Sequence, residues 1–309
     1  MINPENVPAH SIHAWLLAIR PKTFGVAVAP VLAALAVCLS DTGTINPLVA
    51  LLTALLAILM QAITNMENDS GYSKRKAERT NRKGLPRATS LGLLTVKEVE
   101  IGIAVAAVMA IAITAYFIYL THWFFLLITV ASIAAAYLYM GGPRPIAYSP
   151  YGEIVVFLFF GLVATAGTYY LQVQTVSVTI LLVGCALGLI AAGVLCVNNF
   201  RDREHDESIA RYTMAVVLGK TMTIAAYRLM LFVPYALILC IVGMDWTKYP
   251  YLLVFVTLLK AWKLPVELAT KSGLELNATL FATVKLEVLF ALSLTLGALI
   301  HAYLTWFAQ

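Results

Sequence analysis

Charged residues are scarce in this chain. Lysine, arginine, aspartate and glutamate make up 12% of its 309 residues, whereas hydrophobic residues make up 61%. A soluble globular domain carries about 25% charged residues, so this composition excludes an ordinary soluble protein and indicates an integral membrane protein. We expect one helical membrane domain over residues 1–309, although length alone would suggest two soluble domains.

Cysteine is also scarce. The four cysteines are Cys38, Cys185, Cys196 and Cys240. They lie scattered in apolar segments, without the spacing of a metal site or a disulfide framework, so we interpret them as small buried hydrophobic residues. We expect no cleavable signal peptide, because the polar start through Arg20 and Lys22 continues into a full-length apolar span.

Long apolar stretches are what the chain has in abundance. About nine of them are long enough to cross roughly 30 Å of hydrocarbon. They lie near residues 23–40, 46–66, 97–120, 122–140, 152–172, 177–199, 222–243, 249–263 and 279–307. The sequence therefore predicts an all-α fold, a polytopic membrane bundle of about nine transmembrane helices.

Basic residues fall on alternate connections between these stretches. Those on the N-terminus and the even-numbered connections are Arg20, Lys22, Lys74, Arg75, Lys76, Arg79, Arg82, Lys83, Arg87, Arg144, Arg201, Arg203, Arg211, Lys220, Lys263 and Lys271. The other connections carry only Lys248. Under the positive-inside rule this alternation predicts a cytoplasmic N-terminus and an external C-terminus.

Two polar clusters lie at the predicted cytoplasmic ends of the second and sixth spans, in residues 65–69 and 198–206. Asn198, Asp202 and Asp206 are spaced i, i+4, i+8, which places them on one face of a helix. Such hard oxygen ligands suit Mg²⁺ bound between a few carboxylates and substrate phosphates. Nearby arginines would contact the remaining phosphate oxygens. A solvated helix end with local salt bridges is the alternative, which two clusters on one side disfavour.

These residues carry a resemblance that extends over nearly the whole chain. The matching segments are Arg20-Pro21-Lys22-Thr23, Asn65-x-x-Asn68-Asp69, Gly84-Leu-Pro-Arg87, Gly141-Gly142-Pro143-Arg144-Pro145-Ile146-Ala147-Tyr148, Gly152-Glu153, Gly167-Thr168-Tyr169-Tyr170-Leu171-Gln172, Asn198-Asn199-x-Arg201-Asp202-x-x-x-Asp206 and Arg211-x-Thr213-x-Ala215. On these residues the chain resembles the UbiA superfamily of intramembrane prenyltransferases. The segment 141–148 favours its 1,4-dihydroxy-2-naphthoate branch over the 4-hydroxybenzoate branch.

One position departs from the family pattern. The first motif of the family reads Asn-x-x-x-Asp, but counting from Asn68 the aspartate position holds Tyr72, and the later acid is Glu78. A tyrosine is a poor ligand for Mg²⁺ because its ordinary pKa is about 10. Either Asp69, Glu67 or Glu78 takes over the role, or the first metal site is weakened.

The resemblance implies a bundle around a central cavity open to the cytoplasmic side of a bacterial cytoplasmic (inner) membrane. It implies a Mg²⁺-dependent transfer of a polyprenyl group from its diphosphate to an aromatic acid, with loss of CO₂, giving a demethylmenaquinone. The implied catalytic residues are Asp202, Asp206, Asn68, Asp69 and Tyr148. The implied diphosphate-binding residues are Arg82, Arg87, Arg201, Arg211, Asn198 and Asn199. The implied metal ligands are Asp202, Asp206, Asn68, Asp69 and Glu78.

Three other functions stay open at this point. The acceptor could be 4-hydroxybenzoate or homogentisate. A secondary transporter would use acids along an ion pathway, but here they concentrate at one membrane face. A non-catalytic membrane scaffold is the third alternative. We expect the lipid bilayer and the two substrates as partners and no nucleic acid. Prenyl chain length and oligomeric state are not encoded in recognisable motifs.

Overall fold

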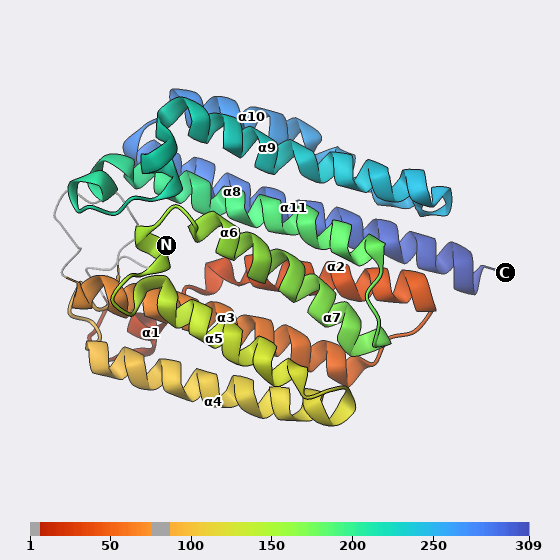
Figure 1. Ribbon diagram of the computed structural model, residues 1–309, viewed down its shortest axis with the longest axis horizontal. Coiled ribbons are helices and arrows are strands. Elements are labelled where there is room, and N and C mark those ends of the chain that lie inside the picture. Colours follow the sequence, from red (N-terminus) through yellow and green to blue (C-terminus); the bar gives the residue numbers. More distant parts are fainter. Residues whose placement is uncertain (1–6, 76–86, 309) are drawn as a thin grey trace.

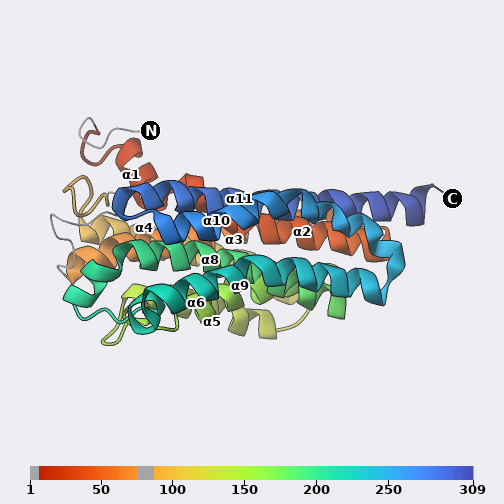
Figure 2. The same ribbon diagram turned by 90° about the horizontal axis from the view of Figure 1, so that it is seen from above.

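The computed structural model describes residues 7–75 and 87–308, and within these ranges it consists of helices and connecting loops, without β-strands. Figures 1 and 2 show the long helices side by side along the long axis of an elongated bundle. The last turns of α3 and α8 lie at one end, here named the motif end. The C-terminus lies at the opposite end, here named the far end (Figure 1). The predicted all-α bundle is confirmed.

The elements follow one another along the chain. They are α1 (Ile12–Ile19), η2 (Pro21–Thr23), α2 (Phe24–Thr42), α3 (Pro47–Lys74), α4 (Val96–Leu120), α5 (Phe124–Met140), η3 (Ile146–Tyr148), α6 (Gly152–Val156), η4 (Phe157–Val163), α7 (Ala164–Val173), α8 (Val178–Ser208), α9 (Met214–Met244), η5 (Trp246–Thr257), α10 (Leu258–Thr270), η6 (Gly273–Glu275), α11 (Leu276–Ala302) and η7 (Tyr303–Phe307).

Seven helical segments in the described ranges are long and apolar enough to cross a membrane. α5 is shorter, and the segment from Trp246 to Thr270 changes from 3₁₀ to α geometry at Leu258. The predicted number of about nine transmembrane helices is therefore approximate. The short helix α1 precedes the first long one and was not predicted, because its eight residues carry too weak a pattern.

Both polar clusters lie on helices that continue beyond the apolar stretch. α3 extends to Lys74 and α8 extends to Ser208, so the clusters occupy the last turns at the motif end. The start of α3 is fixed at the far end, where the Asn46 side chain accepts hydrogen bonds from the N–H groups of Leu48 and Val49 and satisfies donors that a helix leaves open. This cap fixes where α3 begins. Because α3 is 28 residues long, its polar cluster lies near the opposite end of the bundle.

The crossing formed by α6, η4 and α7 packs closely against α8. A Cβ atom on Gly161 would come within 2.5 Å of the carbonyl oxygen of Gly184, so glycine is required for this approach, as is common between membrane helices. Residues Phe157–Val163 form a π-helical turn, a feature often found at functional sites. Phe159 and Phe160 of this turn line the central cavity.

A tight turn follows α5. Gly141 ends the helix, and Gly142 has a φ of 70°, a conformation that glycine adopts without steric cost. The turn leads into η3 and so brings Ala147 beside the end of α8, where its carbonyl oxygen accepts a hydrogen bond from Arg211.

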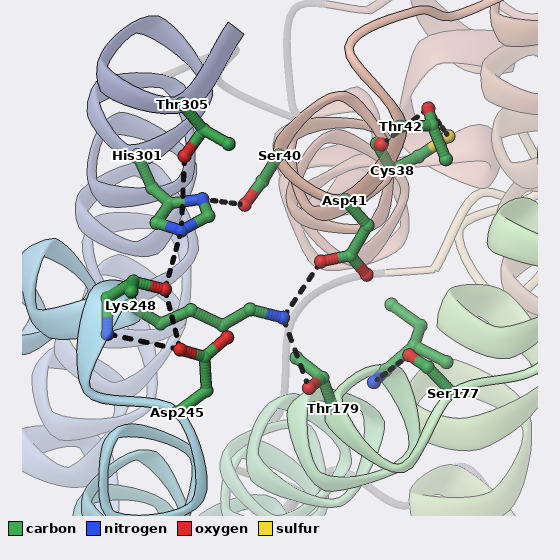
Figure 3. A network of polar contacts seen from close by, with 12 residues as sticks. Cys38, Ser40, Asp41, Thr42, Ser177, Thr179, Asp245, Lys248, His301 and Thr305 are labelled. Carbon is green, nitrogen blue, oxygen red and sulfur yellow. Dashed lines mark hydrogen bonds and ion pairs between the residues drawn. The ribbon is translucent and has the colours of Figure 1, made fainter.

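A polar network joins helix ends at the far end of the bundle (Figure 3). Lys248 donates to Asp41 at 2.8 Å, and Tyr169 donates to the other oxygen of Asp41 at 2.9 Å. His301 hydrogen-bonds with Ser40 at 2.7 Å. Lys248, the exception to the alternating basic pattern, is therefore the partner of a carboxylate. The network ties α2, α7, η5 and α11 together where their apolar packing ends.

Candidate functional site

A cavity of about 340 Å³ lies between the helices and reaches the motif end. Its polar wall there includes Asn68, Tyr72 and Arg87 on one side and Asn198 and Arg211 on the other. Towards the far end the wall is mostly apolar. The apolar lining includes Val31, Leu56, Phe125, Ile128, Phe159, Phe160 and Leu171. A cavity with cations at one end and hydrocarbon along its length suits an amphiphile with an anionic head and an apolar tail.

Asp69 holds the chain that returns after the first cluster. Its carboxylate accepts hydrogen bonds from the N–H of Ala88 at 2.8 Å, and from the N–H and hydroxyl of Thr89 at 2.9 and 2.5 Å. The side chain is fully buried and does not line the cavity. In this arrangement Asp69 fixes the backbone beside Arg87, which does line the cavity.

Asp202 and Arg201 form a bidentate ion pair on α8. The guanidinium donates to both carboxylate oxygens, at 2.8 and 2.6 Å. The same guanidinium donates to Asn198 at 2.9 Å and to Asn277 of α11 at 2.7 Å. Both charged side chains are almost completely buried, so each charge needs the other. The sequence could not predict that Asn277 contacts this ion pair, because Asn277 and Arg201 are 76 positions apart in the chain.

Asp206 pairs with Arg211 at 3.1 Å, and both side chains are buried. Arg211 also donates to the carbonyl oxygen of Ala147 at 2.6 Å and to the hydroxyl of Tyr72. Arg211 thus joins the end of α8 to α3 and to η3. It is also a cavity-lining cation, while Asp206 lies behind it.

Asn199 turns away from the cavity. Its amide donates to Glu153 of α6 at 2.9 Å, and Glu153 is buried as well. Asn199 thus fixes α6 against α8. Asn198, the preceding residue, lines the cavity. The two amides of the motif therefore have different contacts: Asn198 faces the cavity and Asn199 contacts α6.

Aromatic residues near the site fall into three groups. Tyr139, Phe159 and Phe160 line the cavity. Tyr148 packs beside Tyr72 and lies off the cavity wall, with the guanidiniums of Arg75 and Arg211 5.4 and 6.0 Å from its ring centroid. Burial raises the pKa of the Tyr148 phenol above its usual value. Two further tyrosines lie away from the cavity wall: Tyr169 donates to Asp41 at the far end, and Tyr137 is half exposed.

The structure thus brings the two clusters to one cavity, through Asn68 and Tyr72 on α3 and Asn198 on α8. The predicted residues Arg82 and Glu78 lie outside the described residues. Thr23 and Asn65 lie in segments that the resemblance marked, but the sequence did not indicate that Thr23 accepts hydrogen bonds from Gln61 at 3.1 Å and from Asn65 at 2.9 Å. All three line the cavity. The one-turn spacing of the two amides was the available signal.

The described residues hold no group of three acidic, histidine or cysteine side chains that converge on one point. Mg²⁺, however, is usually held by one or two carboxylates together with substrate phosphates. Asn68 offers a buried amide oxygen that lacks a hydrogen-bond partner in the structure and lies on a residue of the cavity wall. This oxygen fits a metal that binds jointly with a diphosphate. The Asp202 carboxylate is not on the cavity wall, and both of its oxygens accept from Arg201, so it would hold the metal by exchanging that ion pair for the cation.

The all-helical bundle, its membrane-length helices and this cavity are the features of an integral membrane protein with a binding site between its helices. The sequence profile of the UbiA prenyltransferase family matches residues 27–286, and the chain belongs to this family. It is 34% identical over 213 residues to the 1,4-dihydroxy-2-naphthoate octaprenyltransferase of Escherichia coli (strain K12), covering 67% of this chain and 69% of that protein. The Haemophilus influenzae protein of the same name is 30% identical, covering 80% and 83%.

Solved structures share the fold. A UbiA homolog from Archaeoglobus fulgidus bound to DMAPP and Mg²⁺ superposes with a TM-score of 0.65 at 16% identity, over 91% of this chain and 98% of that chain. The structure of a UbiA homolog from Aeropyrum pernix K1 gives a TM-score of 0.65 over 89% and 97%. The family predicted from the sequence is confirmed.

Proposed function

We propose that this chain transfers a polyprenyl group from polyprenyl diphosphate to 1,4-dihydroxy-2-naphthoate, within the biosynthesis of menaquinone. The cavity carries this proposal, because its lining combines arginine and asparagine side chains at the motif end, among them Arg87, Arg211, Asn68 and Asn198, with a long apolar wall. The naphthoate acceptor is supported by the names of the relatives that are 30–34% identical.

The proposed reaction breaks and forms bonds without any net gain or loss of a proton. The C–O bond between the allylic carbon and the diphosphate breaks, and the diphosphate leaves with the electron pair. A C–C bond forms at the ring carbon that carries the carboxylate. The carboxylate then leaves as CO₂ and its bonding electrons return to the ring, giving the reduced form of a demethylmenaquinone.

The residues of the chain bind and stabilise the head group. Arg87 and Arg211 donate to the diphosphate and stabilise the negative charge that develops on the leaving oxygen. Asn68 and Asp202 would hold Mg²⁺, which would further neutralise that charge when bound. The apolar wall excludes water from the allylic cation, and the faces of Tyr139, Phe159 and Phe160 stabilise it.

The alternation of basic residues supports an orientation in which the motif end faces the cytoplasm of a bacterial inner membrane. The head group then enters from the side on which soluble precursors are made, and the tail lies among the helices within the bilayer.

The test is an assay of the purified full-length protein with farnesyl diphosphate, Mg²⁺ and a panel of aromatic acids. We expect prenylation of 1,4-dihydroxy-2-naphthoate with one CO₂ released per product. Prenylation of 4-hydroxybenzoate or homogentisate instead would overturn the acceptor assignment. No transfer to any acceptor, together with cation-driven uptake into proteoliposomes, would favour the transporter alternative.

A further inference from the structure

Tyr72 contacts two arginines of the cavity at once. The guanidinium carbon of Arg87 lies 3.4 Å from the centroid of the Tyr72 ring, and the phenolic hydroxyl accepts a hydrogen bond from Arg211. The tyrosine is 3% exposed and lines the cavity together with both arginines. The two guanidiniums come from segments more than 120 positions apart in the chain, and Tyr72 is a contact that they share.

Other contacts also hold the two arginines: the backbone beside Arg87 is held by hydrogen bonds, and the Arg211 side chain has two further partners. The segment that follows Arg87 is held by Asp69, one turn before Tyr72 on α3. Arg211 is held by Asp206 and by the carbonyl oxygen of Ala147. These contacts fix where the two side chains begin, and Tyr72 fixes where their charged ends lie.

A tyrosine orients these cations without neutralising them. Its ring face attracts a guanidinium through the ring quadrupole, and its hydroxyl accepts a hydrogen bond. A carboxylate in the same place would form ion pairs with both arginines and cancel charge that an anionic ligand needs. Tyr72 therefore contacts both guanidiniums without adding a negative charge to the cavity wall.

We propose that Tyr72 is a positioning residue that aligns Arg87 and Arg211 to bind the diphosphate group of the prenyl substrate. The inference deepens the proposed function and rests on it for the identity of the anion. Tyr72 itself touches neither the reacting carbon nor the aromatic acceptor in this assignment, so its effect on the reaction passes through the two arginines.

The test compares Tyr72→Phe and Tyr72→Leu with the wild-type protein in detergent. Calorimetric titration with inorganic pyrophosphate measures head-group binding without turnover, and KM is measured separately for farnesyl diphosphate and for the naphthoate. Tyr235→Phe is the matched control, because Tyr235 is 4% exposed and hydrogen-bonds with Thr257 at 2.7 Å, away from the cavity lining.

We expect Tyr72→Leu to weaken pyrophosphate binding about thirtyfold and to raise KM for farnesyl diphosphate similarly, with KM for the naphthoate unchanged. Tyr72→Phe keeps the stacking surface and should lose about fivefold. Wild-type pyrophosphate binding in both variants would overturn the inference, and so would an equal rise in both KM values. If pyrophosphate binding depends on Tyr72 while no aromatic acid is prenylated, the proposed function fails and the positioning role stands.

Discussion

Asp69 and Thr89 are 20 positions apart in the chain, and the Asp69 carboxylate accepts both the N–H and the hydroxyl of Thr89, at 2.9 and 2.5 Å. The sequence suggested that this carboxylate was a metal ligand. In the structure it is a buried anchor for the segment that presents Arg87, and the cavity wall is formed by its neighbours Asn68 and Tyr72.

Replacing Asp69 by alanine should therefore reduce both stability and head-group binding. Two buried N–H groups would lose their acceptor, at a cost of about 1–3 kcal/mol each, and Arg87 would lose its fixed backbone. Thermal unfolding in detergent and pyrophosphate titration measure the two effects. Thr89→Ser keeps the hydroxyl and should behave like wild type. A fully stable Asp69→Ala variant with normal pyrophosphate affinity would contradict the anchor role.

Asp202→Ala and Asp206→Ala should both abolish prenyl transfer while the protein still inserts in membranes. Each variant should also cost about 3–5 kcal/mol of stability, because it removes the paired charge of a buried arginine. Each arginine keeps two neutral partners, which are Asn198 and Asn277 for Arg201 and the Ala147 carbonyl and Tyr72 hydroxyl for Arg211. Activity assays, membrane fractionation and unfolding curves test this. Normal activity of Asp202→Ala would remove the metal assignment, and normal activity of Asp206→Ala would remove the role of Asp206 in holding Arg211.

Tyr72→Asp should change the metal requirement and the substrate affinity in opposite directions. The new carboxylate adds a hard ligand beside Asn68, so the Mg²⁺ concentration for half-maximal rate should fall about tenfold. The same carboxylate would pair with Arg87 and Arg211, so KM for farnesyl diphosphate should rise. Initial rates over a Mg²⁺ titration check both, with Tyr72→Asn as the uncharged control. An unchanged Mg²⁺ requirement would show that position 72 lies outside reach of the metal.

Lys248→Met should destabilise the protein by roughly 2 kcal/mol without altering KM for either substrate. Asp41 would lose its cationic partner at 2.8 Å and, among the described residues, keep the hydroxyl of Tyr169 as a side-chain donor. Lys248→Arg retains the charge and should be near wild type in thermal unfolding. A change in substrate KM with unchanged stability would place this network in the functional site instead.

Sequence patterns predicted the elements better than the contacts between them. Apolar length predicted the long helices, and the i, i+4 spacing placed Asn198 and Asp202 on one face of α8. The pattern could not show that Asn199 turns to Glu153 or that Asp69 turns to Thr89, because both depend on the course of another segment. The π turn at Phe157–Val163 was equally hidden, since its residues are uniformly apolar.

The central claim is that the ends of α3 and α8 jointly bind the head group of a prenyl diphosphate. The most direct measurement is an experimental structure with farnesyl thiolodiphosphate and Mn²⁺, whose anomalous signal marks the metal. We expect diphosphate density beside Arg87 and Arg211, with the anomalous peak within reach of Asn68 and Asp202. A diphosphate bound elsewhere, or a metal peak away from both helix ends, would contradict it.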